Sequence, residues 1–293
     1  MQNFDKVFPK APQISKEEWE KARSTGRYEY IAFEEYKFIA QIVAFVSNIK
    51  TSSPAYRSIN IQSSNILIGL LNRCARLMLA TLDLSHKAKF GETSSIIFRC
   101  IVETGVKIIW LCDDSTQDKF DRYIGDSLKA EIEIENMIRE NIAARGGTEI
   151  PIETRMLNSV NYHIKKAQTT RNRIVESKRM PDMATLIDSI GFNRLVYNAF
   201  YRMGSHHVHG TWPSLIFHYL EESEKEGEFV PRGNDSSTSA NEYIGVSLVM
   251  VKSLLAYCKF ALDEESFKAF KVLLEATEKE NMDIFDDMTK NGF

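Results

Sequence analysis

The fold is decided by the stretch Glu92–Cys112, ETSSIIFRCIVETGVKIIWLC, which is the most apolar part of the chain. Its apolar residues recur at the three- and four-residue spacing of an α-helix. Charged residues interrupt the stretch at Arg99, Glu103 and Lys107. Because charges inside a membrane are costly, this interruption argues against a membrane span. The stretch therefore predicts a long helix in the core of a protein that has no membrane partner.

Helical spacing recurs on both sides of this stretch, whereas the alternation typical of strands is rare. Glycine and proline, which interrupt helices, number only 14 and 7 among 293 residues. A capping box at Ser15–Glu18 opens a first short helix. Further helices are predicted over about 28–50, 65–86, 92–112, 117–145, 151–168, 181–191, 193–209, 214–222, 242–262 and 266–287. We therefore expect an all-α fold, a helical bundle of roughly four to six core helices with peripheral helices.

One long polar segment stands between these helices, at about 223–241. It is rich in glycine, serine and charged residues, and we expect it to be a mobile loop. Neither an internal repeat nor a low-complexity tract is evident. The expected organisation is an N-terminal helical extension over residues 1–58, followed by a helical bundle domain over residues 59–293 that contains the mobile loop.

The bulk composition is that of an ordinary soluble protein. The net charge is −3, so any binding of a polyanion must come from a local basic patch. The four cysteines are widely spaced and form no C-x-x-C pair, which favours reduced thiols. The N-terminus lacks the basic start and apolar run of a secretory signal. The sequence therefore predicts a cytoplasmic protein.

Three of the six histidines lie together in YRMGSHHVHG, residues 201–210. On a helix that turns by about 100° per residue, Arg202, His206 and His209 share one face, while His207 points elsewhere. Histidine changes charge near neutral pH, and the C-terminal end of a helix stabilises the protonated form. Gly210 is a natural end for this helix. The candidate catalytic residues are Arg202, His206, His207 and His209, with Tyr201 and Ser205 as candidate binding residues.

A second group of charges lies on the long apolar helix. Arg99, Glu103 and Lys107 are four residues apart, which is the spacing of ion pairs along a helix. One interpretation is a structural ladder of salt bridges. The other makes these three residues a binding stripe opposite the histidines, with Glu103 orienting an imidazole, because buried charges need partners.

The two helices together resemble a widespread bacterial family of all-helical domains of unknown function. In that family a helix with an R-x-x-x-E motif precedes a helix with a Y-x-x-x-S-x-x-x-H-G motif. Here the first motif is Arg99 with Glu103, and the second is Tyr201, Ser205 and His209 followed by Gly210. The resemblance spans roughly residues 60–220, and it implies a helical fold without implying an activity.

A looser resemblance is to the HEPN superfamily (higher eukaryotes and prokaryotes nucleotide-binding), whose signature is an arginine followed after four to six residues by a histidine. Arg202 precedes His207 by four intervening residues and His209 by six. This resemblance implies a homodimer that acts on RNA, as a metal-independent ribonuclease of a bacterial defence or toxin-like system. Arg202 would stabilise charge on the phosphate, and a histidine would move protons from the 2′-hydroxyl. Met203 follows the arginine where such ribonucleases usually carry a polar residue.

The alternative is a non-catalytic module that binds a partner protein or senses a ligand. In that case the histidines, Ser205 and Tyr201 form a hydrogen-bonded packing cluster at the helix end. A zinc site would need a third ligand beside His206 and His209, and neither H-E-x-x-H nor paired C-x-x-C motifs occur. We therefore expect no metal and no cofactor. Solvent-accessible histidines near a basic groove would favour the ribonuclease, and buried histidines the packing module.

Overall fold

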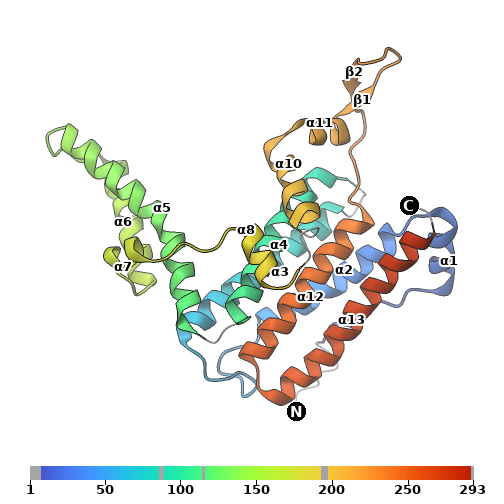
Figure 1. Cartoon of the computed structure of the whole chain (residues 1–293), viewed down its shortest axis with the longest axis horizontal. Coiled ribbons are helices and arrows are strands. Elements are labelled where there is room, and N and C mark those ends of the chain that lie inside the picture. Colours follow the sequence, from blue (N-terminus) through green and yellow to red (C-terminus); the bar gives the residue numbers. More distant parts are fainter. Residues whose placement is uncertain (1–7, 86–88, 114–115, 193–196, 292–293) are drawn as a thin grey trace. The chain divides into compact units, whose positions relative to one another are not determined.

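The computed structural model describes residues 8–85, 89–113, 116–192 and 197–291 (Figure 1). Helices dominate it, and the strands within the described residues form a two-stranded antiparallel sheet. The predicted all-α fold is therefore confirmed. The helices are α1 (Lys16–Thr25), α2 (Glu29–Ser47), α3 (Ile61–Ser85), α4 (Gly91–Asp113), α5 (Gln117–Ala144), α6 (Pro151–Lys166), α7 (Arg171–Glu176), α8 (Met183–Ser189), the π-helix η2 (Tyr197–Arg202), α10 (Met203–His209), α11 (Trp212–His218), α12 (Ala240–Ala261) and α13 (Glu264–Lys290). The strands are β1 (Leu220–Glu222) and β2 (Phe229–Pro231), with Leu220 opposite Pro231.

The described residues fall into two compact units. The main unit comprises the described residues within Met1–Asn60, Ser64–Asp113 and Met183–Phe293. The α5–α7 unit comprises Ile61–Ser63 and the described residues within Asp114–Asp182. The sequence suggested a division at residue 58, but α2 packs against α12 in the core of the main unit. The residues of α2 therefore belong with the rest of this core, because both faces of α12 need apolar partners.

The core of the main unit is built around α12, which packs against α2, α4 and α13 (Figure 1). Most of the apolar side chains of α12 are buried, as expected for a helix that is surrounded by others. Three aromatic rings tie three helices together, because the ring centroid of Tyr243 lies 5.4 Å from that of Tyr36 and 5.8 Å from that of Phe98. Each such side chain contributes roughly 1.5–3 kcal/mol when fully buried.

Side-chain caps fix where several of these helices begin. The capping box predicted at Ser15 and Glu18 is present at the start of α1. A second capping box, formed by Ser239 and Glu242, starts α12. Asp263 accepts hydrogen bonds from the backbone N–H groups of residues 265 and 266 at the start of α13. These caps satisfy backbone donors that helix starts would otherwise leave unpaired.

The α5–α7 unit has a small apolar core of its own. Its buried residues come from α5, α6 and α7 and are Leu128, Ile132, Val160, Ile164 and Ile174. Beside them the buried Glu135 carboxylate accepts hydrogen bonds from Arg139 on its own helix and from Arg171 on α7. Burial opposes the charge of Glu135, but the two arginines outweigh it and hold the pKa of this carboxyl below its ordinary value.

Three local predictions were wrong. The helix expected over 214–222 ends at His218, and β1 follows it. The segment 223–241, expected to be a loop throughout, contains β2, because Phe229 pairs with β1 and packs edge-on against Trp212 with ring centroids 5.4 Å apart. Between the helices predicted over 151–168 and 181–191 lies α7, a helix that was not predicted, whose Ile174 is buried in the core of the α5–α7 unit.

By length and composition α3 and α12 could each cross a membrane. This is weak evidence, since core helices of soluble proteins share both properties. The most apolar 18-residue window of α12 is 67% buried inside the structure, whereas that of α3 is 39% buried.

Candidate functional site

The histidine segment packs on the long apolar helix, as the binding-stripe interpretation of Arg99, Glu103 and Lys107 requires. Gly204 of α10 lies against the aliphatic part of Arg99 on α4, where a side-chain Cβ at position 204 would come within 3.0 Å of the Cβ of Arg99. The guanidinium carbon of Arg99 is 4.5 Å from the ring centroid of Tyr201, a cation–π contact. The Arg99 Nε atom is buried without a hydrogen-bond partner in the described part of the chain. Gly204 thus allows α10 to approach α4 closely enough for Tyr201 to cover Arg99.

The backbone before α10 is unusual, because η2 is a π-helix that ends at Arg202. Such segments place one extra residue in a turn and often occur at functional sites. The α-helix that follows, α10, ends at Gly210, whose φ of 56° is in the left-handed region that favours glycine. The predicted stop of the histidine helix at Gly210 is therefore confirmed, whereas residues 193–196 of its predicted start lie outside the described residues.

Two of the predicted catalytic side chains face solvent. Arg202 and His209 are both exposed, and across the described ranges neither side chain has a hydrogen bond or an ion pair. His206 is half-buried, and its Nδ1 atom lies 2.7 Å from the Oγ1 atom of Thr211. The η2–α10 segment therefore presents the Arg202 guanidinium before α10 and the His209 imidazole at its C-terminal end to solvent, and Thr211 contacts the imidazole of His206.

His207 belongs to a different cluster on the inner side of α10. Its Nδ1 atom lies 3.2 Å from Nε2 of His218 on α11, and the Nδ1 atom of His218 lies 2.5 Å from Oγ of Ser236. Burial lowers the pKa of both imidazoles, and for His218 the neighbouring His207 lowers it further. The sequence-based expectation of protonated histidines is therefore wrong for His207, because desolvation outweighs the helix end.

Two glutamates at helix starts surround this histidine pair. Glu92, in the first turn of α4, accepts hydrogen bonds from the Ser214 and Tyr219 hydroxyls. Glu242, in the first turn of α12, accepts one from the Ser95 hydroxyl. The bond to Glu92 raises the pKa of Tyr219. Carboxylates are favoured at helix N-termini, so these glutamates fasten α11 and α12 to the start of α4.

The remaining predicted binding residues make contacts that stabilise the local helical structure. Glu103 accepts a hydrogen bond of 2.7 Å from Lys107, and about a third of each side chain is exposed. Ser205 on α10 donates a hydrogen bond to the backbone oxygen of Tyr201 in the preceding π-helix η2. The structure therefore places Glu103 in an ion pair along α4 rather than on an imidazole, which matches the ladder interpretation for this part of the stripe.

Sequence reasoning missed His218, Glu92, Ser236 and Tyr219. Glu92 carried a signal, since it is an acidic residue in the first turn of the most apolar helix. Ser236 carried no such signal. It lies in a polar segment 145 positions after Gly91, and the Gly91 N–H donates a hydrogen bond to the backbone oxygen of Ser236. Among the described residues, no group of three or more histidine, cysteine, aspartate or glutamate side chains is arranged to hold a metal ion.

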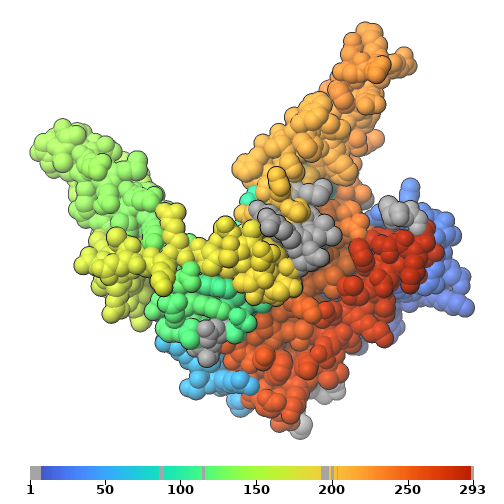
Figure 2. Space-filling model, viewed as in Figure 1, coloured from blue at the N-terminus to red at the C-terminus, as the bar shows by residue number. Residues whose placement is uncertain are grey.

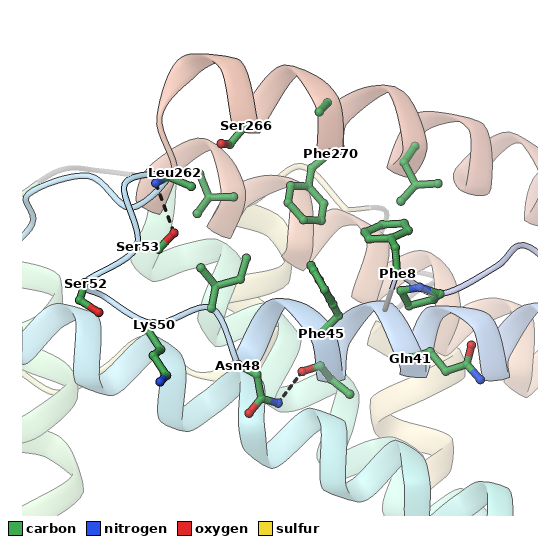
Figure 3. Close-up of a pocket in the computed structure, with 16 residues that line it drawn as sticks. Phe8, Gln41, Phe45, Asn48, Lys50, Ser52, Ser53, Leu262, Ser266 and Phe270 are labelled. Atoms are coloured by element: carbon green, nitrogen blue, oxygen red, sulfur yellow. Dashed lines mark hydrogen bonds between the residues drawn. The ribbon is translucent and has the colours of Figure 1, made fainter. Parts of the chain in front are cut away.

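A separate apolar groove of about 1290 Å³ lies between α2 and α13 in the main unit (Figure 3). The rings of Phe8, Phe45 and Phe270 gather in it, with the Phe8 ring centroid 5.1 Å from that of Phe45 and 6.2 Å from that of Phe270. Lys50 is the charged residue in its lining. None of the residues predicted from the sequence to form a site lines this groove, and among the described residues its lining contains no histidine, aspartate or glutamate.

No curated protein and no solved structure matches the chain significantly. A family model does match, and it covers residues 64–228, more than half of the chain. The matched region includes the Arg99–Glu103 motif, the histidine segment and His218. The chain therefore belongs to the DUF5677 family, which is described as a family of unknown function.

Proposed function

We propose that this protein acts on RNA, as a metal-independent ribonuclease of a bacterial defence or toxin-like system. The observation that carries the proposal is the exposure of Arg202 and His209 on one short helical segment, without a hydrogen bond or ion pair among the described residues. The resemblance of the Arg202–His209 spacing to the HEPN signature supports it. So does the close packing of Gly204 on Arg99, because it holds the segment firmly on α4.

Three side chains have separate roles in the proposed cleavage reaction. Arg202 neutralises the phosphate, while His209 takes the proton of the 2′-hydroxyl as its oxygen attacks phosphorus. His206 gives a proton to the departing 5′-oxygen. Thr211 assists the protonated His206, because its hydroxyl oxygen accepts a hydrogen bond from Nδ1–H and leaves the Nε2 proton free to transfer to the 5′-oxygen. The products are a 2′,3′-cyclic phosphate and a free 5′-hydroxyl, and no metal ion takes part.

The test is cleavage of end-labelled single-stranded RNA by the purified protein in the presence of a chelator. We expect Arg202→Ala and His209→Ala each to lower the rate by roughly 10²–10⁴-fold, which is the range for loss of one acid–base or charge-stabilising group. Arg155→Ala and His163→Ala serve as matched controls, since both side chains are exposed on α6. Cleavage that requires Mg²⁺, or that persists in both site variants, contradicts the proposal.

The second candidate is a non-catalytic interaction module, which would bind a partner protein or a second copy of this chain. A specific observation favours it. The segment from α11 to β2 projects from the rest of the main unit (Figure 2), and α11 exposes Trp212, Leu215, Ile216 and Phe217. Apolar patches of this kind commonly mark interaction sites. Folded protein that cleaves no RNA, yet self-associates or retains a partner through these side chains, would favour this candidate.

A further inference from the structure

Three groups from separate segments form a line in the main unit. Ser236 follows β2, His218 ends α11, and His207 belongs to α10. The Ser236 oxygen lies 2.5 Å from one nitrogen of His218, and the other nitrogen of His218 lies 3.2 Å from His207. We propose that Ser236 is an activated nucleophile that accepts acyl groups from carboxylic esters, with His218 as its base and His207 as a positioning residue. This site is distinct from the exposed Arg202 and His209, and the proposal does not depend on the ribonuclease.

The hydrogen bonds specify where the protons lie. His218 can accept the hydroxyl proton at Nδ1 only if its own proton is on Nε2, and His207 is in position to accept that Nε2–H. Both imidazoles favour the neutral form, because burial lowers the pKa of each. His207 therefore fixes the tautomer of His218 that serves as a base, the task that a carboxylate performs in many catalytic triads.

The surroundings favour the charges that the reaction creates. Glu92 and Glu242 both favour the protonated form of His218, so they stabilise the imidazolium that forms on proton transfer. The Ser236 backbone oxygen accepts a hydrogen bond of 2.9 Å from the Gly91 N–H at the start of α4. A Cβ at position 91 would lie 2.8 Å from the Ser236 Oγ, so glycine is required for this approach. The positive end of the α4 dipole then faces the serine oxygen.

The covalent step balances without a metal or an oxidant. The Ser236 Oγ bonds to the ester carbonyl carbon while its proton moves to Nδ1 of His218. The carbon–oxygen bond of the ester breaks, and the leaving alcohol takes that proton from His218. Water then attacks the acyl-serine by the same route and releases the carboxylic acid. Ser236 itself is half-buried rather than sealed in the core.

A fluorophosphonate probe tests this on the intact protein, with the labelled residue located by peptide mass spectrometry. We expect an adduct on Ser236 that is lost in Ser236→Ala. Ser237→Ala is the matched control, because the Ser237 side chain is exposed and takes no part in the relay. Labelling should accelerate as the pH rises through the titration of His218. His218→Gln should slow it by roughly 10²–10⁴-fold.

His207→Asn separates a positioning role from a structural one. We expect it to move the midpoint of the pH–rate profile of labelling while the melting temperature and the far-ultraviolet circular dichroism stay close to those of the wild type. Replacement of the buried His218 can unfold α11, so the serine pair decides the question by itself. Folded wild-type protein that is labelled at Ser237 as readily as at Ser236, or at neither, overturns the proposal.

Discussion

Single residues decide how closely the helices around the site approach each other. Gly105 lies where α4 crosses α12, and a Cβ there would come within 2.8 Å of the Ser253 Oγ and 3.1 Å of a Val249 methyl. Both neighbours belong to the most buried helix, where a displaced side chain has little free space. Gly69 on α3 offers a contrast, since it is exposed and a Cβ there meets nothing within 4 Å.

Gly105→Ala should lower the free energy of unfolding by about 1–3 kcal/mol, because the added methyl overpacks the α4–α12 contact. Gly69→Ala is the matched control, and it should raise this free energy by about 0.5–1 kcal/mol through helix propensity alone. Urea denaturation followed by circular dichroism measures both. If both substitutions raised the free energy of unfolding equally, α4 and α12 would be able to move apart without loss of stability.

At the scale of helices, α2 and α13 are held in antiparallel register at both ends. The Tyr28 hydroxyl donates to Asp287 at one end, and Phe45 packs near Phe270 at the other. Between these contacts lies Glu35, whose side chain is buried and whose Oε2 atom has no hydrogen-bond partner among the described residues. Burial raises the pKa of Glu35 to about 7, and the nearby charges of Glu280 and Glu34 act in the same direction.

The stability of the α2–α13 contact should therefore depend on pH. The pKa of Glu35 in the folded protein exceeds its ordinary value of 4.5, so its protonated form stabilises the fold fully below about pH 4.5. This stabilisation is lost as the pH rises through about 7. The pKa difference corresponds to about 3 kcal/mol.

Denaturation midpoints between pH 5 and 8 test this. Glu35→Gln should flatten the pH dependence and stabilise the protein at pH 8, whereas Glu29→Gln, an exposed position on the same helix, should leave the dependence unchanged. An identical pH profile for wild type and Glu35→Gln would show that Glu35 finds a compensating partner in the folded protein.

At the scale of the whole molecule, the two units differ in how much apolar core they possess. The main unit buries side chains from three long helices that pack around α12, whereas the α5–α7 unit relies on a small cluster and on the Glu135 bonds to Arg139 and Arg171. A segment with few buried apolar contacts opens at lower free energy than a large core. The charged residues of α5 thus serve local stability within their own unit.

Hydrogen exchange followed by mass spectrometry should show faster exchange in α5–α7 than in α12. Glu135→Ala should accelerate exchange further in α6 and α7 only, because it leaves Arg171 without its buried partner. Glu133→Ala is the matched control, since this neighbour on α5 is exposed. Exchange that rises equally in α12 would show that the two units open together.

Most of the helices, and the C-terminal end of the histidine segment, could be predicted from the sequence. The Ser15–Glu18 capping box, the end of α10 at Gly210 and the pairing of Glu103 with Lys107 are all local features. They follow from spacings of three to five residues, which fix neighbours on a helix whatever the rest of the chain does. The family motifs, Arg99 with Glu103 and Tyr201 with His209, were readable for the same reason.

Tertiary structure alone decided which side chains meet across the chain. His207 contacts His218 rather than solvent. This contact depends on the turn at Gly210 and on the position at which α11 docks against Glu92. Ser236 reaches that pair only because Gly91 leaves room for its backbone. Such contacts depend on packing between segments that are distant in sequence, and helical periodicity carries no information about them. Burial lowers the pKa of His207, whereas its place near a helix end had led us to expect a protonated imidazole. This desolvation exists only once the core is folded.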